Sequence, residues 1–103
     1  MTGTNERRTV QRIAFFTEAS LEGLDVGRTD VRITEISAGG AFVDTRSVLP
    51  AGAVTYLLFT LGDRQLRVKA QVRYAIPSIG MGLAFTELSP EDRQTLAEFV
   101  GVR

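Results

Sequence analysis

The sequence predicts an all-β fold, a small barrel of six short strands followed by one terminal helix. Two observations lead to this prediction. Short segments in which apolar and polar residues alternate recur along the chain, separated by turn signals that contain glycine or proline. A helix start signal follows near the C-terminal end, at Ser89 to Asp92. With 103 residues the chain is long enough for one domain with a single core.

The first half of the chain contains the less regular strands. Residues 1–11 predict a flexible N-terminal segment, and residues 12–103 predict the barrel with its helix. Residues 12–19 are rich in β-formers and predict the first strand, whereas glycines and an aspartate within residues 21–27 predict a loop. Residues 29–36 predict a half-buried strand. Its last apolar residue falls on the wrong parity, which indicates a β-bulge.

The second half contains clearer patterns. Residues 41–43 predict a short strand, and residues 54–61 predict a strand buried on both sides because both faces are largely apolar. Residues 65–73 alternate most regularly. Their polar face is basic, and we interpret it as a solvated outer face rather than a binding patch. Residues 81–86 predict the last strand.

The terminal helix has clear end signals. Ser89 is suited to capping and Pro90 to the first helical position, and two carboxylates follow at the positive end of the helix dipole. This location favours a capping role for the carboxylates over acid–base catalysis. Leu96, Phe99 and Val100 form one apolar stripe, so we expect the helix to dock on the barrel or on another subunit.

Composition excludes several classes of function. The chain has no Cys and no His, which rules out disulfides, thiolate or His-based zinc sites, Ser-His-Asp triads and Cys-His pairs. Twelve basic and twelve acidic residues cancel, so no overall field attracts a nucleic acid polymer. No apolar run is long enough to span a bilayer, and the first residues do not resemble a signal peptide. We therefore expect a cytoplasmic protein without membrane insertion.

Two short stretches are candidates for anion binding. Arg7, Arg8 and Arg12 place three guanidinium groups within six residues, and guanidinium suits phosphate and the guanine edge. A solvated basic tail remains the alternative. Ser37 precedes Gly39 and Gly40, and exposed N–H groups of such a turn can form a concave anion site. A hairpin corner whose serine caps the local backbone is the alternative here.

Together these stretches resemble the PilZ domain family. That family has an Arg-x-x-x-Arg motif, which matches Arg8–Arg12 with Arg7 in front, and then Asp/Asn-x-Ser-x-x-Gly, which corresponds to Glu35–Gly40. The segments Gly80–Phe85 and Leu88–Asp92 also fit, so the resemblance covers nearly the entire chain. It implies a six-stranded antiparallel barrel with one C-terminal helix, and a bacterial receptor for cyclic di-GMP.

The resemblance also implies a site and a mode of action. The implied ligand-binding residues are Arg7, Arg8, Arg12, Glu35, Ser37, Gly39 and Gly40. The arginines would meet phosphate and the guanine O6/N7 edge. Binding would order the N-terminal segment over the barrel, which a downstream protein can detect. No catalytic residue, metal or cofactor is implied, and an enzyme is the least favoured interpretation.

One position departs from the family pattern and leaves an alternative open. Glu35 stands where the family has Asp or Asn, so its carboxylate lies one methylene further out. A displacement of roughly 1.5 Å is large for a group that must accept a guanine N–H. The alternative is a protein-interaction adaptor of the same fold, with weakened or lost nucleotide binding. An exposed apolar patch or a homodimer would favour it.

Overall fold

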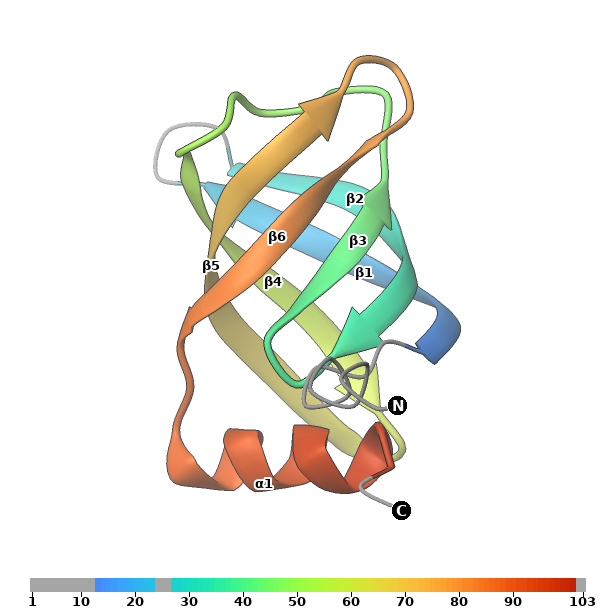
Figure 1. Ribbon diagram of the computed structural model, residues 1–103, viewed down its shortest axis with the longest axis vertical. Helices are drawn as coiled ribbons and strands as arrows, with labels where there is room; N and C mark the ends of the chain where they lie inside the picture. The colour runs from blue at the N-terminus through green and yellow to red at the C-terminus, as the bar shows by residue number, and fades with distance from the viewer. Residues whose placement is uncertain (1–12, 24–26, 102–103) are drawn as a thin grey trace, which may run out of the picture.

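The computed structural model describes residues 13–23 and 27–101. They form a closed antiparallel barrel whose strands are neighbours in the order β1-β2-β3-β6-β5-β4, with a helix across one end (Figure 1). This confirms the predicted six-stranded antiparallel barrel and its C-terminal helix. The elements are β1 (Ile13–Gly23), β2 (Gly27–Ser37), β3 (Gly40–Asp44), β4 (Val54–Leu61), β5 (Arg64–Ile76), β6 (Gly80–Glu87) and α1 (Pro90–Phe99).

The core fills the barrel because alternate residues of each strand point inward. In β5 the inward residues are those that the sequence pattern predicted, and all are at most 3% exposed. Ile33, Val43, Leu57 and Met81 are fully buried and add to the core from the other strands. A two-residue turn, in which Gly62 has a φ of +61°, joins β4 to β5 and fixes their register.

Two predictions about the strands are wrong. Leu21 was placed in a loop, but β1 continues to Gly23 because Leu21 is only 5% exposed and pairs with both β2 and β4. Within the range 21–27, residues 24–26 lie outside the described part. The strand β4 is not buried on both sides either. Its inward face is buried, whereas Val54 is 41% exposed and Leu58 is half-buried on the outer face.

The helix α1 closes one end of the barrel. Its start is confirmed, because the Ser89 hydroxyl oxygen accepts a hydrogen bond from the Asp92 N–H at 3.0 Å. Leu96 is fully buried. The ring of Phe99 meets that of Phe15 on β1 edge to face, with 4.7 Å between centroids. Gly101, with a φ of +82°, follows the helix end.

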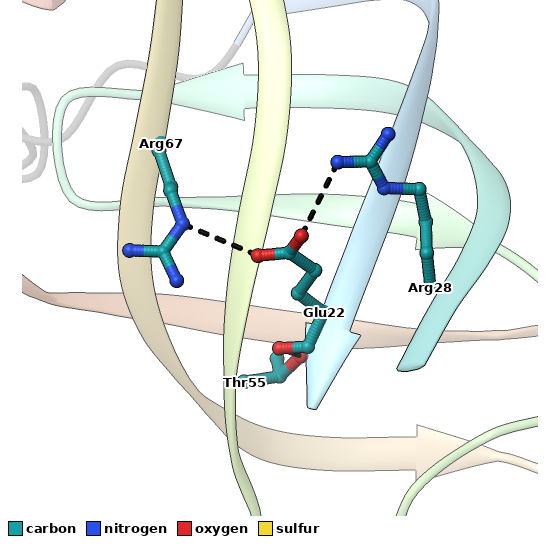
Figure 2. A network of polar contacts seen from close by, with 4 residues as sticks. All are labelled: Glu22, Arg28, Thr55 and Arg67. Atoms are coloured by element: carbon teal, nitrogen blue, oxygen red, sulfur yellow. Dashed lines mark hydrogen bonds and ion pairs between the residues drawn. The ribbon is translucent and has the colours of Figure 1, made fainter. Parts of the chain in front are cut away.

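Ion pairs cover much of the outer surface of β5. The Glu22 carboxylate on β1 bridges Arg28 of β2 and Arg67 of β5, at 3.2 Å each (Figure 2). These two arginines hold the pKa of Glu22 below its usual range. Two further basic residues of β5, Arg64 and Lys69, pair with carboxylates of α1 and β6. The basic face predicted for this strand is therefore largely neutralised.

A polar group in the core is also satisfied in this region. Thr55 points inward and is 1% exposed, yet its hydroxyl donates to the backbone carbonyl of Glu22 at 3.1 Å (Figure 2). This bond removes the penalty for burying a hydroxyl.

Among the described residues, no helix combines the length and the apolar character needed to cross a membrane.

Candidate functional site

A pocket of about 340 Å³ opens beside the turn that joins β2 to β3. Its walls come from β2, β3, β5 and β6, so residues far apart in the sequence meet there. The predicted residues Glu35, Ser37, Gly39 and Gly40 all line it. Its volume lies near the lower end of the roughly 300–1,000 Å³ typical of small-molecule sites. The second predicted motif thus surrounds a hollow that can hold a small ligand.

Ser37 organises the turn beside this pocket. Its Oγ accepts hydrogen bonds from the N–H groups of Gly39 at 3.2 Å and Gly40 at 3.1 Å, and donates to the Gly40 carbonyl at 3.3 Å. A serine hydroxyl has one donor and two acceptor positions, so all three are used. With a side chain only 5% exposed, Ser37 forms the backbone-capping corner that was the alternative interpretation of this stretch.

Gly40 permits a close approach between two strands. A Cβ atom at this position would collide with the carbonyl oxygen of Leu83 on β6. Gly39 is different, because open space surrounds its Cα and its carbonyl accepts the N–H of Phe85 at 2.8 Å. The turn is therefore anchored to β6, and glycine is required at position 40 by packing.

Glu35 reaches the pocket because β2 contains a bulge. Ile33 is the Cα partner of Val43 and Glu35 that of Phe42, so β2 has one extra residue, Thr34, at this point. Inward residues are Ile33 and Ile36, and the two residues between them are only half-buried. The bulge confirms the explanation given for the parity of Ile36. It also directs a carboxylate to the pocket.

Two residues of the pocket were not predicted, Arg73 and Tyr74 of β5. Adjacent strand residues normally point to opposite faces, but here both are exposed. The cause is a second bulge, because Val72 pairs with Leu83 and Tyr74 with Gly82 of β6. The sequence did contain a signal, because two residues that are not aliphatic follow each other after a strictly alternating run.

Arg73 supplies the pocket with a cation. Arg64, Arg67 and Lys69 of the same strand are each paired with a carboxylate. Within residues 13–23 and 27–101, no carboxylate lies within ion-pair distance of Arg73. Arg73 therefore brings to the pocket a positive charge that no carboxylate of the described residues pairs with.

The first predicted motif lies outside the described residues. Arg7, Arg8 and Arg12 all precede Ile13, with which the described chain begins. Ile13 is the Cα partner of Ile36, the neighbour of Ser37. The chain therefore enters the barrel next to the second motif.

These features define a class, a small β-barrel domain with a pocket beside a serine-glycine turn. The PilZ domain family model matches residues 6–101, and the chain therefore belongs to the PilZ domain family. The comparison with curated protein sequences gave no match.

Solved structures share the fold. The inhibitor of motility MotI/DgrA of Bacillus subtilis is 23% identical with a TM-score of 0.78, over 91% of this chain and 49% of that protein. The PilZ domain of CeSA from a cellulose-synthesizing bacterium is 18% identical with a TM-score of 0.69, over 87% of this chain and 94% of that domain.

The PlzA protein of Borreliella burgdorferi was solved in complex with c-di-GMP. It is 13% identical with a TM-score of 0.69, over 88% of this chain and 40% of PlzA. The chain thus spans about half or less of the length of MotI/DgrA and of PlzA.

Proposed function

We propose that this protein is a receptor for cyclic di-GMP that acts through a partner and has no catalytic activity of its own. The observation that carries the proposal is the pocket of about 340 Å³, which is lined by every residue of the second motif that was predicted to bind ligand. Membership of the PilZ domain family and the nucleotide complex of the structurally similar PlzA support it. The family is bacterial, and we infer a cytoplasmic location.

In this proposal, the phosphates and guanines of the ligand are bound by the N-terminal arginines and by the second motif. Arg8 and Arg12, with Arg7 in front, would bind phosphate and the guanine O6/N7 edge. Chain connectivity keeps the Cα of Arg12 about 3.8 Å from that of Ile13. Because Ile13 pairs with Ile36 beside the pocket, the segment that carries these arginines joins the barrel next to the place proposed for the ligand. Binding would order the N-terminal segment over the barrel and present a new surface to the partner.

The Ser37 turn would serve binding by holding its shape. The Ser37 hydroxyl is saturated by hydrogen bonds within the turn, so it fixes the backbone of Gly39 and Gly40 before any ligand arrives. A site that is already in its binding shape loses little free energy to ordering. Glu35 would accept N–H donors of guanine, a role that the family's Asp or Asn suggests.

Calorimetric titration with cyclic di-GMP tests this function, with GTP and GMP as control ligands. We expect saturable binding of the cyclic dinucleotide alone, and strongly weakened binding in Arg8→Ala and Arg12→Ala. Arg46→Ala is the matched control, because Arg46 is exposed and does not line the pocket. A folded protein that releases no heat with cyclic di-GMP would refute the receptor function, and so would a double variant Arg8→Ala/Arg12→Ala that binds like the wild type.

A second candidate function is the adaptor of the same fold. Ile76 and Ile79 flank the β5–β6 turn and are 41% and 57% exposed, and such apolar residues are suited to a protein contact. The adaptor predicts that Ile79→Ser changes the oligomeric state or the capture of a partner while the nucleotide has no effect. Light scattering of the ligand-free protein, with and without this substitution, would reveal a homodimer.

A further inference from the structure

We propose that the junction of β1 with β4 opens before the rest of the barrel, and that contacts made by Glu22 and Thr55 keep it closed. At this junction, residues 20–22 of β1 pair with residues 56–58 of β4 and complete the barrel. A further step rests on the proposed receptor function, namely that a bound ligand favours the closed junction. The strand that follows the arginine motif thereby acts as a movable element.

The pairing at this junction is short. Among the described residues, β1 pairs with β4 only at residues 20–22, whereas β4 pairs with β5 along its whole length, Val54–Leu61. The first part of β1, residues 13–19, therefore has a described strand partner on one side only, β2. That pairing is itself interrupted by a bulge between Ala14 and Thr17. The part of β1 that enters the barrel is thus held by less backbone pairing than the inner strand β4.

The strand β1 also contributes little to the buried core. Leu21 is the one buried residue of this strand, and the others are half-buried or exposed. Phe16 is even 71% exposed. In β5, by contrast, four residues are buried, Leu66, Val68, Ala70 and Val72. Segments that bury few apolar side chains open locally at the lowest cost in free energy.

Polar contacts of Glu22 span the junction. Its carboxylate on β1 accepts from Arg67 of β5 at 3.2 Å and so reaches across β4 (Figure 2). The Arg67 guanidinium lies 4.0 Å from the ring centroid of Tyr56, the β4 partner of Glu22. The Thr55 hydroxyl, 1% exposed, donates to the Glu22 carbonyl at 3.1 Å. These contacts exist only while the junction is closed, and each is weak enough to break and form again.

The position of β1 gives a reason for coupling to a ligand. The arginines of the first motif precede Ile13, whereas the walls of the pocket include β5 and β6. A ligand bound by both sets of residues would connect β1 to strands beyond β4. Opening of the junction would separate the two sets, so the ligand would bind the closed barrel more tightly and favour it.

A rigid barrel is the competing explanation. The strands of a closed barrel are tilted and staggered, so a short pairing can result from geometry alone. In a rigid barrel, the amides at the junction exchange with solvent only when the entire domain unfolds. Local opening predicts instead that they exchange with a free energy below that of global unfolding.

Hydrogen exchange of the full chain, measured by NMR at single amides in increasing urea, separates these explanations. We expect the amides that bond across the junction to exchange by local opening, and those between β5 and β6 only by global unfolding. The strand β4 contains an internal control, because alternate amides of an inner strand face opposite neighbours. Its amides that face β5 should be better protected than those that face β1. Equal protection with the same urea dependence at both places would overturn the proposal.

Two substitutions test the residues that hold the junction closed. Thr55→Val removes the hydroxyl and keeps the shape, and should speed exchange at the junction roughly 2- to 10-fold relative to β5. Glu22→Gln removes both ion pairs and should act in the same direction. The matched controls are Thr60→Val, at an exposed position of β4 outside the junction, and Glu18→Gln, whose ion pair joins β1 only to β2. Equal effects of the controls would overturn the assigned roles.

A disulfide provides the opposite perturbation. Ser20 and Leu58 are Cα partners across the junction and the chain has no cysteine, so Ser20→Cys/Leu58→Cys can form a single disulfide. We expect the oxidised variant to lose the local exchange and the reduced variant to regain it. Local exchange that persists in the oxidised variant would place the opening elsewhere and overturn the proposal.

The coupling is tested by adding cyclic di-GMP to the wild type. At 100 times its Kd, the ligand should slow exchange at the junction about 100-fold if the open form does not bind it. Binding without such slowing would overturn the coupling and leave the receptor function intact. Absence of binding would overturn the coupling and the receptor function together, whereas the opening itself is decided by the exchange of the ligand-free protein.

Discussion

Replacing Ser37 with alanine removes a hydroxyl whose donor and acceptor positions are all used by the β2–β3 turn. Three hydrogen bonds are lost, two from the glycine N–H groups and one to the Gly40 carbonyl. Alanine fits the same space, so the change tests the hydrogen bonds rather than packing. The proposed role of Ser37 as the organiser of the turn predicts a loss of stability even without ligand.

The magnitude follows from the surroundings of the groups that are left behind. Gly39 is exposed, so water can satisfy its N–H, whereas Gly40 is half-buried. A typical hydrogen bond contributes about 0.5–1.5 kcal/mol, and a buried partner left unsatisfied costs about 1–3 kcal/mol. We therefore expect Ser37→Ala to lower the free energy of unfolding by about 1–3 kcal/mol. In a domain of this size each kcal/mol lowers Tm by roughly 4–8 °C.

Urea unfolding followed by far-ultraviolet circular dichroism measures this change. Ser47→Ala is the control, because Ser47 is exposed and such surface changes stay within about 0.5 kcal/mol. We also expect weaker binding of cyclic di-GMP, as a consequence of the loosened turn. If Ser37→Ala were as stable as the wild type but had lost binding, the hydroxyl would act on the ligand directly and our account of the turn would be wrong.

Three further substitutions test the remaining parts of the fold. Gly40→Ala forces a Cβ against the carbonyl of Leu83 and should destabilise by about 1–3 kcal/mol, measured by urea unfolding, whereas Gly39→Ala has open space and should be mild. Leu96→Ala empties a fully buried position and should lower the free energy of unfolding by about 2–5 kcal/mol; a smaller loss would mean that α1 is loosely docked. Glu22→Gln removes a carboxylate whose pKa is lowered, first by Arg28 and then by Arg67. Above the unfolded-state pKa of about 4.3, the Gln variant should be less stable than the wild type. This difference in stability should vanish as the pH falls through the lowered folded-state pKa of Glu22. A difference that persists in acid would exclude the ion pairs as its cause.

Much of the fold could be predicted because inward and outward residues alternate with period two. In β5 this pattern identified each inward residue from Leu66 to Val72, and the broken parity at Ile36 indicated the bulge in β2. The errors arose where long-range pairing decides the structure. Leu21 is followed by turn-like glycines, and only its pairing with β2 and β4 keeps it in a strand. In β4 an apolar outer residue such as Val54 gave no information about whether anything covers it.

The candidate site was only partly predictable for a related reason. Ser37 and Gly40 are close in sequence, so a short motif reveals them together. Arg73 and Tyr74 lie more than thirty residues further on and reach the pocket only through barrel closure and a bulge. No short motif connects segments so far apart.

The bulge in β5 has a consequence for how such a pocket can change between related genes. Arg73 is the additional residue, so deleting one codon there would leave Val72 pointing inward and Tyr74 outward, as in an unbroken strand. The inside-outside pattern of the remaining strand would be preserved, because the residue lost is the one that interrupts it. A single deletion can therefore remove the cation of the pocket and spare the core, and a single insertion can restore it.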